Sequence, residues 1–430
     1  MISVEGRRYR RRELELFGGL KDDDVQLLQE TVTVTDVALR KSEPLELEEE
    51  LPLSDNFPEP ETILRCDVTL VENHKQINRD KAVVSGTAYY TIMYLPRAEA
   101  QTAKGNEPAA KGPNAAEEPI LFQTKSEFTQ FVSLGRRGDT DTGKGSQTDT
   151  PSGRLFFRVQ KVSAEPKGGE SGIKNSIHVK VEGETFLELY REVERRVVTD
   201  AYHHQKELAF DTESVELMQL SSCGIGETTV REVIGIPEQI SGVKNITFLS
   251  GTLKNVNSHI EGGKNVVEGQ VEAHFVCLSD DEKPTPFDMV RPIPFRVTLD
   301  LPVGMSGPLG TAVAAASPLT AAPLPDNEVI LKELRYDRLN DRQIEVTAAV
   351  QVNGAIIRKK QCPLIRNVGF VEETGPRQER PGLVLYIARR GDTLWKIARK
   401  YRTTMEAVAK INGIETGAPL KAGTKLLIVK

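Results

Sequence analysis

Three stretches of the chain alternate between apolar and polar residues, which is the pattern of β-strands with one buried and one solvent-exposed face. These stretches span residues 64–70, 177–181 and 344–352. Successive side chains of a strand point to opposite faces of its sheet, so strict alternation places the apolar residues on one face. Antiparallel sheets that pack together as a sandwich have this pattern. We therefore predict that the chain is mainly β.

Two segments of this β-body look like copies of one another. Residues 81–95, KAVVSGTAYYTIMYL, align with residues 264–278, KNVVEGQVEAHFVCL, through a shared Val-Val-x-Gly motif. Each is followed by an acidic, proline-containing insert, by a strand around Phe128 or Phe295, and by a hairpin-like stretch. Such self-similarity indicates duplicated structural units. We predict two tandem all-β, sandwich-like repeats of about 150 residues or more, a size that suits this architecture.

The last fifty or so residues follow a helical period instead. Leu394, Ile397, Ala398 and Tyr401 are spaced i, i+3, i+4 and i+7, so they share one face of a helix. A second short helix and two flanking strands complete a small α+β unit. The second helix is expected to place Met405, Val408 and Ala409 inward, and the two flanking strands contain Leu383, Tyr386, Leu426 and Ile428.

Polar residues around these two helices predict where each one begins and ends. Asp392 stands where the first helix needs an N-cap, because its carboxylate can accept from free backbone amides. Thr403 and Glu406 have the spacing of a capping box at the start of the second helix. Asn412 and Gly413 tolerate the left-handed backbone conformation, so they are expected to end that helix.

This βααβ order, with Gly-Asp-Thr in the turn before the first helix, resembles a LysM module. The resemblance implies binding of N-acetylglucosamine-containing glycans, such as peptidoglycan or a chitin-like glycan, or of another protein. Asp392 and Asn412 have an alternative role as helix caps only. Trp395, the only tryptophan, is expected to pack rather than to stack on a sugar. By position, the groove of the family maps to Gly391, Asp392, Thr393, Leu394, Asn412, Gly413 and Ile414.

The C-terminal unit is basic although the whole chain is acidic. Residues 382–430 contain ten basic and three acidic residues, a net charge of +7, while the chain totals −6, which leaves −13 for the rest. This asymmetry indicates an anionic partner surface or contact between basic and acidic segments; the alternative is a solvated basic surface. We predict a basic docking face at Arg399, Lys400 and Arg402.

Tandem β-repeats that carry the Val-Val-x-Gly strand and precede one C-terminal LysM module resemble the SPOCS-domain family of spore-forming Firmicutes. The resemblance implies a sporulation scaffold of the spore coat, located in the mother-cell cytoplasm at the forespore surface. It also implies that the SpoIVA-like ATPase of the coat basement layer is a partner. The expected domains are a basic N-terminal tail (1–27), two SPOCS-like β-repeats (28–200 and 213–370), a linker (371–382) and the LysM domain (383–430).

Enzymatic and wall-binding functions are the alternatives. The four cysteines and six histidines show no metal-ligand or catalytic spacing, so we expect no catalytic residues, metal or cofactor. The arginines at residues 7–12 could contact acidic lipid or nucleic acid, but a solvated tail is favoured, so no nucleic-acid partner is expected. No stretch is long and apolar enough to span a membrane, and no signal peptide is visible. A peptidoglycan-binding cell-wall protein is the alternative to the scaffold, and a hydrolase hidden in the β-body is the least favoured function.

Overall fold

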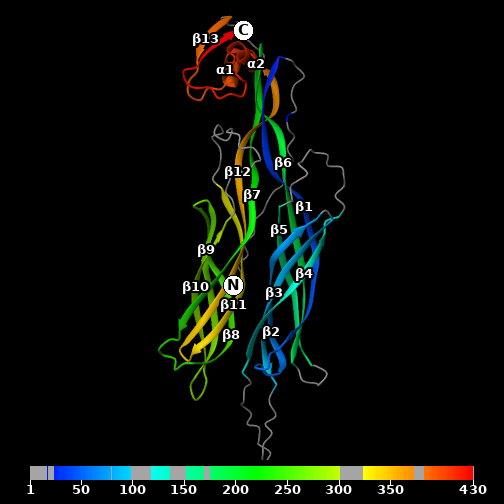
Figure 1. The fold of residues 1–430 in the computed structure, drawn as a ribbon, viewed down its shortest axis with the longest axis vertical. Coiled ribbons are helices and arrows are strands. Elements are labelled where there is room, and N and C mark those ends of the chain that lie inside the picture. Colours follow the sequence, from blue (N-terminus) through cyan, green and yellow to red (C-terminus); the bar gives the residue numbers. More distant parts are fainter. Residues whose placement is uncertain are drawn as a thin grey trace, which may run out of the picture.

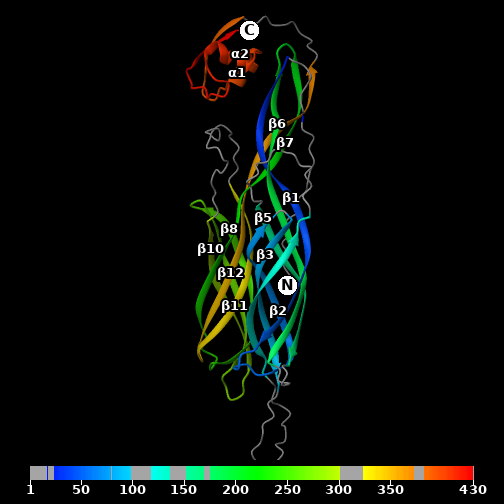
Figure 2. The ribbon, with the colours of Figure 1, turned by 45° about the vertical axis from the view of Figure 1, so that its right-hand side comes forward.

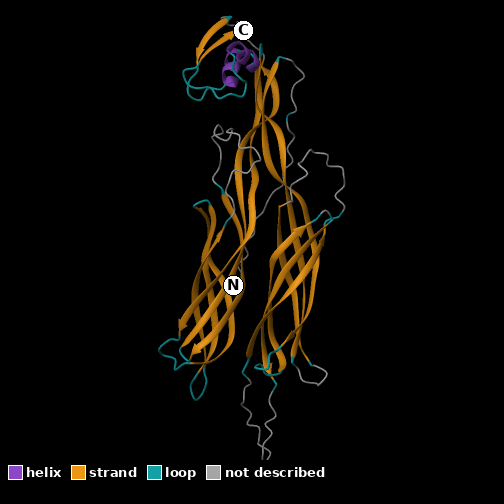
Figure 3. Cartoon of the chain, in the orientation of Figure 1, coloured by secondary structure: helices purple, strands orange, loops and turns teal. Residues whose placement is uncertain are grey.

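The structure is a computed structural model that describes residues 17, 24–78, 80–97, 118–135, 152–168, 175–300, 323–371 and 382–429. Strands make up most of these residues, and two short helices lie near the C-terminus (Figure 3). The prediction of a mainly β chain is confirmed. Most of the predicted N-terminal tail (1–27) and linker (371–382) lies outside the described residues. No helix in the described ranges has the length and apolar character needed to cross a membrane.

The first half of the described chain is a sandwich of two antiparallel sheets. One sheet has the order β1–β6–β5 and the other the order β2–β3–β4. Tyr90 and Ile92 of β3 pack in the interior with Leu45 of β1 and Ile177 of β6, all essentially inaccessible to solvent. The strands are β1 (Val25–Pro52), β2 (Pro60–Ile77), β3 (Lys81–Pro96), β4 (Ile120–Ser133), β5 (Ser152–Lys167) and β6 (Ser176–His203).

The second half repeats this topology with six further strands. Its sheets have the orders β7–β12–β11 and β8–β9–β10, so each strand corresponds to the one six places earlier. The prediction of two tandem sandwich-like repeats agrees with this arrangement. The strands are β7 (Glu207–Gly235), β8 (Val243–Glu261), β9 (Lys264–Ser279), β10 (Pro286–Leu299), β11 (Leu324–Asn340) and β12 (Gln343–Val371).

The glycine of the duplicated Val-Val-x-Gly motif has the same surroundings in both sandwiches. Gly86 of β3 pairs with Phe128 of β4, and Gly269 of β9 pairs with Phe295 of β10. A Cβ atom would lie 2.5 Å from the Phe128 ring at the first position and 2.8 Å from the Phe295 ring at the second. Each ring therefore covers the glycine on the neighbouring strand, which explains why both copies need glycine there.

Four long strands continue past the sandwiches and form a narrow stalk. We define the stalk as the first half of β1 and of β7 together with the second half of β6 and of β12 (Figures 1 and 2). The two ribbons contact each other through apolar side chains. Val32 and Val197 form one buried cluster with Cys362 and Leu364, and a second cluster contains Val198, Ala201, Ile365 and Val368.

Polar contacts join the two sandwiches directly to each other. The Arg154 guanidinium of β5 lies 2.8 Å from the Asp326 carboxylate of β11, and both side chains are largely buried. Gln351 of β12 donates from Nε2 to the carbonyl oxygen of Glu72, at 3.0 Å. Gln123 of β4 donates to the carbonyl oxygen of Leu334, at 2.6 Å. These contacts connect the two repeats into an elongated body, with the C-terminal unit at one end (Figure 1).

Candidate functional site: the C-terminal module and its contact with the stalk

The C-terminal module has the predicted βααβ order. Its elements are β13 (Leu383–Ile387), α1 (Leu394–Tyr401), α2 (Met405–Asn412) and β14 (Lys425–Val429), with β13 and β14 paired antiparallel. The predicted stripe of α1 is buried, since Leu394, Ile397 and Ala398 are at most 3 % exposed. These residues pack in one cluster with α2 and the inner face of the two strands. The helical period had predicted this core correctly.

The predicted N-cap of α1 is wrong by one residue. Thr393, not Asp392, caps the helix, and its Oγ1 accepts from the backbone amide of Lys396 at 3.2 Å. Asp392 closes the preceding turn instead, because its Oδ2 accepts from the Arg389 amide at 2.8 Å and from the Tyr386 hydroxyl at 2.7 Å. The hydrogen bond from the Arg389 amide, followed by that from Tyr386, holds the pKa of Asp392 below its ordinary value.

The second helix also begins one residue later than the capping box predicts. Thr404 is its N-cap, and the Thr404 Oγ1 accepts from the Ala407 amide at 3.0 Å. Thr403 precedes the cap position and is buried. Gly413 has a left-handed backbone (φ +65°) and ends α2, as predicted.

Asn412 joins α2 to β14 through its side-chain amide. Its Oδ1 accepts from the Leu427 amide at 2.7 Å, and its Nδ2 donates to the carbonyl oxygens of Leu427 and Val408, both at 2.8 Å. These bonds satisfy the backbone amide and carbonyl group of Leu427 on the edge of β14 that does not pair with β13. The Asn412 side chain therefore has a structural role in this conformation, and so has the Asp392 carboxylate.

The remaining predicted groove residues are placed around the turn before α1 and the loop after α2. Gly391 (φ +87°), Thr393 and Gly413 are exposed, and Ile414 is half-buried. Leu394 is buried, and Leu394 and Ile414 contribute to the same apolar cluster. This cluster brings the two segments of the predicted groove together. Binding at these residues stays a prediction.

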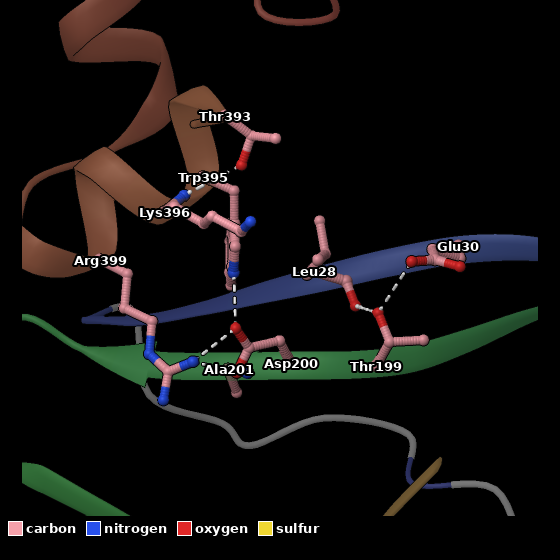
Figure 4. Close-up of polar contacts among 9 residues, drawn as sticks. All are labelled: Leu28, Glu30, Thr199, Asp200, Ala201, Thr393, Trp395, Lys396 and Arg399. Atoms are coloured by element: carbon pink, nitrogen blue, oxygen red, sulfur yellow. Dashed lines mark hydrogen bonds and ion pairs between the residues drawn. The ribbon is translucent and has the colours of Figure 1, made fainter. Parts of the chain in front are cut away.

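The sequence did not predict that this module contacts the tip of the stalk. Asp200 of β6 accepts from Trp395 Nε1 and from Arg399 Nη1, both at 2.7 Å (Figure 4). The neighbouring Tyr202 donates from its hydroxyl to the carbonyl oxygen of Thr403 at 2.5 Å, and its ring meets the Trp395 ring edge-on with centroids 4.9 Å apart. Two sequence signals agree with this contact: Trp395 lies outside the helical stripe of α1, and the charge asymmetry indicated contact between basic and acidic segments.

The predicted basic docking face is divided by the stalk contact. Arg399 pairs with Asp200, and Arg402 donates from Nη1 to the carbonyl oxygen of Gln205 at 2.9 Å. The Lys400 ammonium lies over the rings of Tyr386 and Tyr401, 5.3 and 5.5 Å from their centroids. Arg399 and Arg402 therefore contact the end of the stalk and the adjoining turn of their own chain in this conformation. Docking of an external partner at the basic face stays a prediction.

Comparison with known protein families identifies a LysM domain at residues 386–429. Searches among curated proteins and among solved structures find no match. The chain thus carries a LysM domain, a class of module that binds glycans such as peptidoglycan. The match covers the C-terminal module alone and leaves the two sandwiches without a family assignment.

Proposed function

We propose that this protein is a non-catalytic scaffold that presents a glycan-binding LysM domain at the end of an elongated β-body. The observation that supports this most is the contact between the domain and the stalk. A charge-assisted hydrogen bond from Trp395 of α1 and a buried hydrogen bond to Thr403 in the turn after α1 join the module to β6, together with the Trp395–Tyr202 ring pair. The domain therefore has a defined orientation. A binding domain held in this way positions its ligand relative to the sandwiches.

A non-catalytic role also agrees with the state of the cysteines. Burial raises the pKa of the Cys66 thiol to about 12 and that of the Cys277 thiol to about 11. At neutral pH both are protonated and therefore poor nucleophiles. Both lie within sandwich strands, where they act as small packing residues.

Calorimetric titration of the full chain with N-acetylglucosamine oligomers tests the glycan-binding part. We expect saturable binding that Ile414→Ala weakens about fivefold, because the loss of apolar contact with a sugar methyl group costs about 1 kcal/mol. Ile411→Ala is the matched control, since Ile411 is exposed on α2 outside the predicted groove. Absence of binding, or equal losses in both variants, would refute the proposal.

We further infer that the scaffold belongs to the spore envelope. The support is the resemblance of the tandem repeats and the C-terminal LysM domain to the SPOCS-domain family, which implies the mother-cell cytoplasm, the forespore coat surface and a SpoIVA-like ATPase partner. A fluorescent fusion followed during sporulation should collect around the forespore. Uniform fluorescence throughout the mother cell would contradict this placement.

The protein partner needs a separate test, because part of the basic face binds the stalk. Lys400→Glu changes an exposed charge and leaves Arg399 and Arg402 in place, so it is the interpretable variant. We expect it to weaken capture of the purified coat ATPase by the full chain. Unchanged capture would show that Lys400 does not contribute to partner binding.

A further inference from the structure

The outer face of the C-terminal sheet consists of exposed aliphatic side chains. Alternate residues of β13 and β14 point away from the helices, and the register pairs them across the strands. Leu383 and Leu385 are 62 % and 68 % exposed, and Ile387 is 55 % exposed. Large aliphatic residues gathered in this way on a surface mark a contact site. The aliphatic face comprises Leu383, Leu385, Ile387, Leu427 and Val429.

This face lies opposite the surfaces that the module uses elsewhere. Trp395 and Arg399 of α1 bind the stalk, so the helices lie between the stalk and the sheet (Figure 1). The aliphatic face consequently points away from the stalk, on a module that lies at one end of the elongated molecule (Figures 1 and 2).

Basic side chains surround one end of the aliphatic face. Lys425 pairs with Ile387 at the end of the sheet, and the backbone bonds of Ala388 with Thr424 and Gly423 place the adjoining turns beside it. Arg389, Arg390 and Lys421 in these turns are exposed. None of these four basic side chains forms an ion pair with a residue in the described ranges. Asp392 is the nearby acid, and its carboxylate closes the turn.

We propose that the aliphatic face, with its basic rim of Arg389, Arg390, Lys421 and Lys425, binds the surface of an anionic lipid bilayer. Aliphatic side chains enter the boundary between headgroups and acyl chains, and lysine and arginine bind anionic headgroups. The face lacks the tryptophan, tyrosine and arginine that anchor protein interfaces in their centre. Two such faces would also bring two domains of net charge +7 together, which disfavours a second copy as the occupant.

The acidic remainder of the chain does not prevent this contact. Strand β1 has 28 residues and its first half lies in the stalk, so the stalk spans about 45 Å at about 3.3 Å per residue. Charges of the sandwiches therefore lie many Debye lengths from a bilayer at the tip, since that length is about 8 Å at physiological ionic strength. The bilayer is attracted chiefly by the charges of the module and of the adjoining stalk end.

Co-sedimentation of the full chain with phospholipid vesicles tests the proposal. We expect binding to vesicles of phosphatidylglycerol and phosphatidylcholine that is at least tenfold tighter than binding to pure phosphatidylcholine. Leu385→Ser should weaken binding to the anionic vesicles about tenfold, and Arg390→Glu with Lys425→Glu at least as much. Leu339→Ser is the matched control, because Leu339 is an exposed leucine (51 %) on the second sandwich.

Three results would overturn the proposal. The first is failure of the natural chain to sediment with anionic vesicles. The second is binding that depends on the basic rim but is unchanged in Leu385→Ser, which would make it purely electrostatic. The third is a dimer of the natural chain that Leu385→Ser converts to a monomer, which would assign the aliphatic face to self-association. Unchanged Trp395 emission in each variant confirms that the module is still folded and in contact with the stalk.

Discussion

The Asp200 carboxylate at the tip of the stalk accepts two hydrogen bonds from the C-terminal module. It accepts from Trp395 and from Arg399, and its side chain is 24 % exposed. We expect Asp200→Ala to weaken the contact between module and stalk by about 1–2 kcal/mol, since a charged acceptor is lost at a partly solvated site. Trp395 is the only tryptophan, so its emission should shift to longer wavelength as the indole meets water.

Asp200→Asn is the control for this change. The asparagine oxygen can still accept from Trp395 Nε1, whereas the charge that attracts Arg399 is gone. Its emission should therefore lie between that of the natural chain and that of the alanine variant. If both variants emit at the same wavelength as the natural chain, Asp200 does not hold the module against the stalk.

The Asp392 carboxylate makes the stability of the module depend on pH in the acidic range. Its pKa is lower in the folded state than the ordinary value of 3.8, chiefly through the hydrogen bond from the Arg389 amide. The stability from this group is fully present above that ordinary value and is lost as the pH falls through the folded pKa. Thermal unfolding followed by Trp395 emission should show a smaller decrease between pH 5 and pH 3 in Asp392→Asn than in the natural chain. An equal decrease would place the acid sensitivity elsewhere.

At the scale of single elements, the sequence predicted the buried residues of the helices better than the residues at which the helices begin. The α1 stripe was predictable because a period of 3.6 residues places Leu394, Ile397 and Ala398 on one side. Its N-cap was not, since Asp392 and Thr393 both favour cap positions and only the backbone geometry selects between them. Thr403 and Thr404 present the same ambiguity at α2.

The contact between a glycine and a phenylalanine ring in each sandwich predicts that the same substitution has the same effect in both. Gly86→Ala and Gly269→Ala should each destabilise their sandwich by about 1–3 kcal/mol, because the added methyl group meets a phenylalanine ring. Urea unfolding measures the loss. Gly369→Ala is the control in β12, where a Cβ atom has no neighbour within 4 Å. The variant with both Gly86→Ala and Phe128→Leu should lose less stability than the sum of the two single losses, because the smaller side chain leaves room for the added methyl group. A loss equal to that sum would argue against the ring contact.

At the scale of the whole molecule, the sequence predicted two repeats but not how they lie together. Alternation identifies a strand and its buried face, and it contains no information on which distant strands meet. The stalk depends on Val32 and Val197 meeting Cys362 and Leu364, and the orientation of the module depends on Asp200. These partners are far apart in the chain, and alternation within a strand does not pair them.

The ion pair between the sandwiches is expected to stabilise the whole body. Arg154→Met removes the guanidinium beside the largely buried Asp326 carboxylate, which should cost about 3 kcal/mol in the free energy of unfolding. Lys264→Met is the control, because its pair with Asp300 is solvent-exposed and should cost less than about 1 kcal/mol. Chemical denaturation compares the two variants, and equal losses would contradict a special role for the buried pair. Restoration of stability in Arg154→Met with Asp326→Asn would support it further.

Co-sedimentation with purified peptidoglycan tests most directly whether the elongated body presents a glycan-binding domain. The full chain and a chain ending at residue 381 would be compared over a range of protein concentrations. We predict saturable binding of the full chain and its loss in the shortened chain. Failure of the full chain to sediment, or equal binding of both chains, would contradict the account.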